Sequence, residues 1–276
     1  MYNHETSDVL DIMHRWLDYH LYGMDNGVLE DVANVIVQNN LNQNVWIESD
    51  GFPPEGNVMY KFPVAMDGIK EFVDNIEITN FEVDDQKSDI KGNIAWREEL
   101  ILPMDEEKPH EIKIVVAPEF EGGTKRISGT VKISFEAALD KETGILSAML
   151  VDYGLDKRIT LKEEVVKEKG RVWGRNTETA DIVKFKYEEE SSEYRIISRG
   201  WINAQNVNNN YSKVALVDGE YNAYSFDMIP TDYTFKCNHK LGLIIYGTDP
   251  EETVRRTKTT KVMVKLNTID VNIPVV

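Results

Sequence analysis

Short runs of alternating apolar and polar residues, separated by turn residues, constrain the fold of this chain more than any other feature. Turn signals such as Glu121-Gly122-Gly123, Asp218-Gly219 and Asp249-Pro250 separate them. Because side chains alternate between the two faces of a strand, such runs predict half-buried antiparallel strands. We therefore expect a mainly β protein, with a jelly-roll β-sandwich as the matching architecture. The runs are Val32–Val37, Ile94–Leu102, Glu111–Ala117, Ile127–Phe135, Ile182–Tyr187, Tyr194–Ser198, Tyr221–Phe226, Leu241–Tyr246 and Lys261–Leu266.

The segment ahead of these runs has a helical period instead. Its apolar residues recur at intervals of three and four, which places them on one face of a helix. Thr6, Ser7 or Asp8 can cap the start of this helix, and Gly23 can end it in a left-handed conformation. Because an isolated helix of about 12–15 residues is only marginally stable in water, this apolar face needs a partner. The face comprises Val9, Ile12, Met13, Trp16, Leu17 and Leu21.

The charge and the apolar runs exclude several classes of partner. The 276 residues carry a formal net charge of −17, so the chain repels phosphate backbones and we expect no nucleic acid partner. Apolar runs such as Leu241–Tyr246 fall far short of the roughly 20 residues of a membrane helix. Residues 1–5 resemble no signal peptide, and Cys237 cannot form an internal disulfide, so we expect a cytoplasmic protein with a buried or inert thiol.

Several segments carry a resemblance to a known family. They resemble the carboxy-terminal region of bacterial Xaa-Pro dipeptidyl-peptidases, which are serine peptidases of the α/β-hydrolase superfamily. The amino end is similar to the last helix of that family's hydrolase domain, so the resemblance covers essentially the whole chain. The segments are His14–Gly23, Gly144–Gly154, Arg199–Asn206, Phe226–Tyr233, Leu243–Asp249 and Thr253–Arg255.

The resemblance implies a domain organisation and a function. Residues 1–30 are expected to be the terminal helix of a missing α/β-hydrolase domain, and residues 31–276 a jelly-roll β-sandwich with a galactose-binding-like fold. The parent activity is the release of Xaa-Pro dipeptides from peptide amino termini. This chain is then the non-catalytic carboxy-terminal domain, inactive by itself, whose partner is the catalytic hydrolase domain.

The chain departs from the family's catalytic pattern. It contains no Gly-x-Ser-x-Gly elbow, and alignment of the helix puts the family's catalytic histidine just upstream of Met1. His4 lies a few residues too late, and an imidazole without its serine is no general base for acyl transfer. We therefore predict no catalytic residue, no cofactor and no metal ligand in this chain, and whether the chain is an enzyme stays open.

Other chemistry-bearing residues favour structural roles. His14 and His20 are six residues apart, unlike the i, i+4 spacing of a zinc pair on a helix. Cys237-Asn238-His239 lacks a second cysteine pair for zinc. The cations between Arg255 and Lys261 are expected to meet acidic neighbours, and the acidic turn at residues 84–89 lacks the spacing of a calcium loop.

Three alternatives to this interpretation remain open. Trp46, Trp96, Trp173 and Trp201 could form the aromatic platform of a stand-alone carbohydrate-binding β-sandwich, although tryptophans in period-two runs are more often core residues. A hydrolase with an unconventional site built on paired acids is the second alternative. The amino-terminal helix could also bury its apolar face against the sandwich or against a second copy of the chain, and the second copy would give a homo-oligomer.

Overall fold

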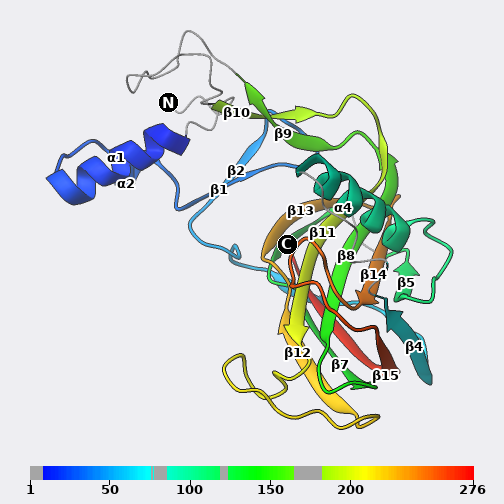
Figure 1. Cartoon of the computed structure of the whole chain (residues 1–276). Helices are drawn as coiled ribbons and strands as arrows, with labels where there is room; N and C mark the ends of the chain where they lie inside the picture. The colour runs from blue at the N-terminus through cyan, green and yellow to red at the C-terminus, as the bar shows by residue number, and fades with distance from the viewer. Residues whose placement is uncertain (1–8, 76, 78–85, 119–123, 165–181) are drawn as a thin grey trace. The chain divides into compact units, whose positions relative to one another are not determined.

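The computed structural model describes residues 9–75, 77, 86–118, 124–164 and 182–276 (Figure 1). Strands make up 46% of the chain and helices 12%. This helical share is far below the roughly one-third of an average globular protein. The expectation of a mainly β fold is confirmed, and the arrangement of its sheets is consistent with a jelly-roll sandwich.

The elements of the structure follow one another in an order dominated by strands. Their bounds are α1 Val9–Tyr22, α2 Val28–Asp31, β1 Val35–Gln38, β2 Trp46–Ser49, β3 Val58–Lys61, β4 Ile69–Asp74, α4 Gln86–Ile101, β5 Glu111–Val116, β6 Thr124–Gly129, β7 Lys132–Leu139, β8 Ile145–Asp156, β9 Ile159–Glu164, β10 Ile182–Tyr187, β11 Ser192–Asn203, β12 Asn222–Asp227, β13 Thr231–Lys236, β14 Lys240–Tyr246 and β15 Thr260–Val275. They divide into two compact units, residues 1–55 with 155–192 and residues 56–154 with 193–276.

The larger unit, residues 56–154 with 193–276, is built on two antiparallel sheets. One sheet has four strands in the order β11-β8-β14-β5. The other has seven strands, with β12-β7-β15-β6-β13 as its main path and β3 and β4 paired to the long strand β15. The register of β15 against β7 shifts between Lys265 and Asp270, so an irregularity in β15 separates two stretches of regular pairing.

The four-stranded sheet is buried on both faces. Leu146, Ala148 and Leu150 of β8 belong to the large apolar core that also includes Phe135 and Val264 of the seven-stranded sheet. The alternate residues of β8, such as Met149 and Val151, belong to a second cluster. Since both sets are apolar, the sequence of β8 is a continuous apolar run and does not alternate between apolar and polar residues.

The second apolar cluster lies beneath α4, which covers one face of the four-stranded sheet (Figure 1). Trp96, Leu100 and Ile101 of α4 pack there against β8 and β14. Burying such large side chains stabilises the unit by roughly 1.5–3 kcal/mol each. The larger unit is therefore a sandwich of two sheets with a helix on one outer face.

The predicted strand at Ile94–Leu102 is wrong. Residues 94–101 form the second half of α4, and Leu102 follows the helix directly. Their apolar residues fit a period of two, but Trp96 and Leu100 are also one helical turn apart and face the same side. The intervening Arg97, Glu98 and Glu99 are good helix formers.

The predicted run Ile127–Phe135 is wrong as a single strand, because β6 ends at Gly129 and β7 begins at Lys132. Gly129 has a φ of 131°, a conformation that favours glycine, so the chain turns there and β7 takes new partners. The first predicted strand also starts later than expected, at Val35, because Val28–Asp31 forms α2. The period-two analysis missed six strands altogether, namely β2, β3, β4, β8, β9 and β13.

The smaller unit, residues 1–55 with 155–192, contains α1, α2 and two antiparallel strand pairs, β1 with β2 and β9 with β10. The predicted helix over residues 9–21 is confirmed as α1, and Gly23 ends it at a φ of 64° with its N–H donated to the Tyr19 carbonyl. The predicted caps Thr6, Ser7 and Asp8 lie outside the described residues. The ring of Trp46 on β2 contacts Phe185 on β10 edge to face, which joins the two strand pairs.

Candidate functional site

A buried aspartate, histidine and tyrosine form a hydrogen-bonded polar group in the larger unit. Asp152 Oδ2 accepts a hydrogen bond from the Tyr233 hydroxyl at 2.7 Å, and Oδ1 lies 2.7 Å from Nδ1 of His239. Asp152 comes from β8, Tyr233 from β13, and His239 from the turn between β13 and β14. The three side chains therefore link the two sheets of the sandwich through one carboxylate.

The surroundings of His239 favour a structural role over catalysis. Its side chain is 4% exposed, and a Cβ placed on Gly154 would lie 2.3 Å from the imidazole ring. The backbone of β8 therefore runs directly against the ring, and a substrate has no approach to it. A histidine that acts as general base must reach the proton that it abstracts. We interpret this Asp–His pair as a structural clamp.

A second buried charged group lies at the junction of α4 and β5. Lys113 Nζ lies 2.9 Å from Glu111 Oε1 and donates hydrogen bonds to the carbonyls of Ile101, Pro103 and Glu106. Because the carboxyl end of a helix carries partial negative charge, a cation at this position stabilises α4. The Tyr153 hydroxyl also donates to the Ile101 carbonyl, at 2.9 Å.

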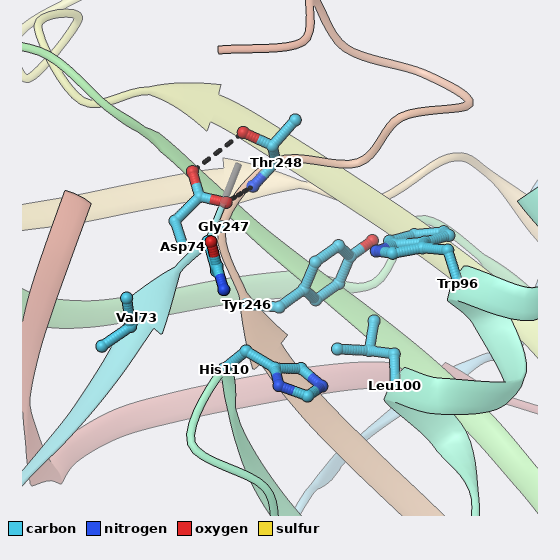
Figure 2. A pocket seen from close by; sticks show the side chains of 9 residues that line it. Val73, Asp74, Trp96, Leu100, His110, Tyr246, Gly247 and Thr248 are labelled. Atoms are coloured by element: carbon cyan, nitrogen blue, oxygen red, sulfur yellow. Dashed lines mark hydrogen bonds between the residues drawn. The ribbon is translucent and has the colours of Figure 1, made fainter. Parts of the chain in front are cut away.

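A small pocket opens between β4, α4 and the end of β14, as Figure 2 shows. Asp74 accepts hydrogen bonds from the backbone N–H and the hydroxyl of Thr248, at 3.0 and 2.8 Å. The pocket encloses about 230 Å³ even with its open mouth included, below the roughly 300–1,000 Å³ of typical ligand pockets. It is lined by Val73, Asp74, Asn75, Trp96, Leu100, His110, Tyr246, Gly247 and Thr248.

Arg199 fixes the loop that follows β14 and borders the pocket. Its guanidinium lies 2.6 Å from Glu251 and 3.3 Å from Asp249, and the Tyr246 hydroxyl donates to Asp249 at 2.8 Å. Burial raises the pKa of Tyr246 well above its usual value, so this hydroxyl stays a donor. Arg97 of α4 also pairs with Glu251, at 3.4 Å, which ties the loop to the helix.

In the smaller unit, the apolar face of α1 is exposed rather than packed. Met13 is 50% exposed, Trp16 49%, Leu17 42% and Leu21 70%. Tyr22, Met24 and Leu29, which follow in the sequence, are exposed as well. A contiguous apolar surface of this kind marks an interaction site more often than a solvated face. We call Met13, Trp16, Leu17 and Leu21 the α1 face.

The residues singled out in the sequence are scattered in the structure. His4, Trp173 and residues 84–85 lie outside the described residues. His14 and His20 are exposed on α1, with His14 Nδ1 3.2 Å from Asp18. The Cys237 thiol is exposed, so it is not the buried thiol that was one of the two expectations, and an inert thiol stays a prediction. Among the described residues, no three His, Cys, Asp or Glu side chains are placed to hold a metal ion.

The described tryptophans of the proposed aromatic platform do not share one surface. Trp96, a residue of α4, is buried against the four-stranded sheet, whereas Trp46 and Trp201 are half-buried on strands of different units. The expected pairing of the cations near residue 260 is seen at Lys261, whose ammonium lies 2.9 Å from Glu71. No helix within the described parts of the chain has the length and apolar character needed to cross a membrane.

Neither the zinc interpretation of Cys237-Asn238-His239 nor the strand predicted at Glu111–Ala117 identifies the two buried charged groups. A usable signal was present, because Glu111 and Lys113 stand two residues apart on one face of a strand whose neighbours are Ile and Val. Paired charges within an apolar strand indicate a buried ion pair.

The larger unit is thus a β-sandwich domain of two antiparallel sheets, with buried polar side chains that bond largely to one another. The comparison with protein families identifies which one. The model of the X-Pro dipeptidyl-peptidase C-terminal non-catalytic domain matches residues 26–273, so the chain belongs to this family.

Curated relatives extend this likeness to nearly the whole chain. A Xaa-Pro dipeptidyl-peptidase of Lacticaseibacillus paracasei is 28% identical over 282 residues, which cover 99% of this chain and 34% of the relative. That of Lactiplantibacillus plantarum is 27% identical over 288 residues, with the same two coverages. The chain thus spans about a third of the length of the curated relatives it matches.

Solved structures show the same fold at low sequence identity. An aminopeptidase from a marine sediment archaeon, a Thaumarchaeota archaeon, aligns over 96% of this chain and 44% of its own with a TM-score of 0.58 and 12% identity. A CocE/NonD family hydrolase of Staphylococcus aureus aligns over 97% and 45%, with a TM-score of 0.55 and 10% identity. At these identities the likeness extends to the fold alone.

Proposed function

We propose that this chain serves as the accessory domain of a serine hydrolase that releases Xaa-Pro dipeptides, and that it packs against and shapes an α/β-hydrolase domain. The observation that carries the proposal is the exposed α1 face, in a chain whose curated relatives are about three times longer. In this proposal residues 1–30 belong with the hydrolase domain and residues 31–276 form the accessory sandwich. The unpaired cysteine supports a cytoplasmic location.

The α1 face supplies the physical basis for this docking. Each large apolar side chain fully removed from water contributes roughly 1.5–3 kcal/mol, so burying the exposed parts of Trp16 and Leu17 would contribute to docking. Arg15 is engaged elsewhere, because its guanidinium bonds to the Asn26 carbonyl and to Asp31, each at 2.9 Å. These bonds fix the turn after α1 and hold α1 and α2 as one surface.

The isolated chain is expected to leave Xaa-Pro chromogenic substrates uncleaved. Among the described residues the one buried Asp–His pair is closed against the backbone, and the sequence contains no nucleophile elbow. The measurement is turnover by repurified protein across pH 6–9. A rate near the ordinary enzyme range of about 1–10³ s⁻¹, retained through repurification, would show that the chain is catalytic and would overturn the accessory assignment.

Replacing Trp16 and Leu17 together with serine is expected to weaken docking to a hydrolase domain on the order of 100-fold, since two apolar contacts are lost. The measurement is sedimentation of the full chain mixed with the separately produced hydrolase domain of the Lacticaseibacillus paracasei relative. Val254→Ser, at an apolar residue that is 83% exposed in the larger unit, is the matched control and should bind as the parent does.

Two outcomes would contradict this assignment of the α1 face. If the double variant binds the hydrolase domain as tightly as the parent chain, α1 is not the docking surface. If the parent chain alone sediments as a dimer that the double variant dissolves, the α1 face serves self-association instead. In that case a second copy of this chain, rather than a hydrolase domain, is its partner.

A further inference from the structure

An aspartate in the connection between β3 and β4 contacts the backbone of the glycine that follows it. The N–H of Gly68 donates a hydrogen bond to Oδ1 of Asp67 at 2.8 Å. Both residues are exposed, and a Cβ placed on Gly68 would meet no other atom within 4 Å. The Gly68 nitrogen therefore lies close to the carboxyl carbon of Asp67, which is bonded to Oδ1, in a place that water reaches.

This contact brings together the two atoms that react when an aspartate isomerises. The Gly68 nitrogen attacks the carboxyl carbon of Asp67, and the new N–C bond closes a five-membered succinimide ring. One oxygen of the protonated carboxyl group leaves together with the amide proton as water. Because reacting atoms that are held about 3–3.5 Å apart react far faster than atoms that must first meet, the folded contact favours ring closure.

Hydrolysis of the ring completes the reaction. Water that cleaves the bond between the Gly68 nitrogen and the side-chain carbon restores aspartate. Water that cleaves the bond between this nitrogen and the main-chain carbonyl carbon of Asp67 gives isoaspartate, in which the chain runs through the side chain. One water is released and one is taken up, so the reaction needs no oxidant, reductant or other reactant.

The glycine at position 68 permits this approach. Its φ is 91°, a conformation that residues with a Cβ rarely adopt. Glycine also has no side chain that would shield its own nitrogen from the carboxyl group of Asp67. The sequence and the backbone conformation therefore both expose this nitrogen to attack on the neighbouring carboxyl carbon.

The other two Asp-Gly pairs of the sequence, Asp50-Gly51 and Asp218-Gly219, lack this contact. The N–H of Gly219 donates to the Leu139 carbonyl at 3.0 Å, so this nitrogen is held by a different acceptor. At Asp50-Gly51, no hydrogen bond in the described part of the chain joins the glycine N–H to the carboxylate. The folded structure thus distinguishes Asp67 from two pairs of the same local sequence.

We propose that Asp67 is a spontaneous modification site, at which aspartate isomerises to isoaspartate through a succinimide. The isomerised chain has one additional backbone carbon just before β4. The Gly68 carbonyl accepts a hydrogen bond from the Leu266 N–H at 2.9 Å, and Ile69 pairs with Lys265. The additional atom therefore falls where β4 begins to pair with β15, and it loosens the first contacts of this pairing.

The test is ageing of the full chain at pH 6, followed by peptide mapping with a protein isoaspartate methyltransferase as the probe. Asp67 is expected to isomerise at least about tenfold faster than Asp50 or Asp218. In guanidinium chloride the three rates should converge, because the unfolded pairs share one sequence and no fixed geometry. In the folded protein, hydrogen exchange of the Leu266 amide should accelerate as isoaspartate accumulates.

Asp67→Glu is the diagnostic variant, because the same attack on a glutamate would have to close a six-membered ring, which forms less readily. It should abolish modification at this position and keep the exchange of the Leu266 amide constant during ageing. Asp218→Glu, at an exposed residue of another Asp-Gly pair, is the matched control. It should leave the isomerisation of Asp67 unchanged.

Three results would contradict the proposal. If isoaspartate rises no faster at Asp67 than at Asp50 or Asp218 in the folded protein, the contact does not promote ring closure. If the difference between the pairs persists in guanidinium chloride, flanking sequence causes it and the fold does not. If the Leu266 amide exchanges equally in fresh and aged protein, the modification does not reach β15. None of these results affects the accessory-domain assignment, since the α1 face does not enter this test.

Discussion

Replacing Lys113 with methionine is expected to destabilise the larger unit by about 3–5 kcal/mol at pH 8, the range found when one partner of a buried ion pair is removed. Methionine keeps the apolar stem but leaves Glu111 as a buried charge without a counter-ion. The carbonyls of Pro103 and Glu106 lose the ammonium donor as well, whereas that of Ile101 keeps the Tyr153 hydroxyl. Urea unfolding followed by tryptophan fluorescence measures the loss.

Two companion variants make this prediction specific. Adding Glu111→Gln to Lys113→Met should recover part of the lost stability, because the uncompensated charge is removed together with its partner. Lys61→Met, at an exposed lysine paired with Asp270 at 3.1 Å, should change stability by no more than about 1 kcal/mol. A Lys113→Met protein as stable as the parent would mean that the buried ion pair contributes nothing to the fold.

Replacing Asp152 with alanine is expected to cost about 2–5 kcal/mol, because two buried donors lose their acceptor at once. The Tyr233 hydroxyl and the His239 imidazole would both remain buried without this partner. Since these side chains come from both sheets, the loss should appear as a lower unfolding midpoint of the whole larger unit. Calorimetry and urea unfolding measure the change.

Variants around the carboxylate separate its two contacts. Tyr233→Phe removes one hydrogen bond together with its donor and should cost only about 0.5–1.5 kcal/mol. Asp227→Asn, at an exposed acid on β12, is the matched control and should be close to neutral. If Asp152→Ala costs no more than this control, the Asp–His–Tyr group is not the clamp between the sheets that the geometry indicates.

Local sequence pattern predicted the amino-terminal helix and several of the strands. The α1 helix and its end at Gly23 were predicted correctly, because an amphipathic period and a glycine carry their meaning within a few residues. Strands such as β12, whose burial alternates residue by residue, were also found. The family resemblance supplied the assignment as a non-catalytic domain, which the family comparison confirmed.

Alternation also fails for a strand that is apolar on both of its faces. The strand β8 was missed by alternation because it lies between the large core and α4, and both of its faces are apolar. The α4 segment was interpreted as a strand because Trp96 and Leu100 satisfy both periods. The segment is a helix because Trp96 and Leu100 then both pack against the apolar face of the four-stranded sheet.

The sequence by itself determined that the chain is mainly β and that it has an amphipathic helix at its amino end. It also determined that the chain contains no Gly-x-Ser-x-Gly elbow. These properties depend on composition and on spacings of a few residues. Only the tertiary structure decided that Glu111, Lys113 and the end of α4 form one junction, and that Asp152 meets His239 87 residues away. The pairing of strands distant in sequence creates such contacts, and the resulting burial, which no local pattern encodes, sets the behaviour of these charges.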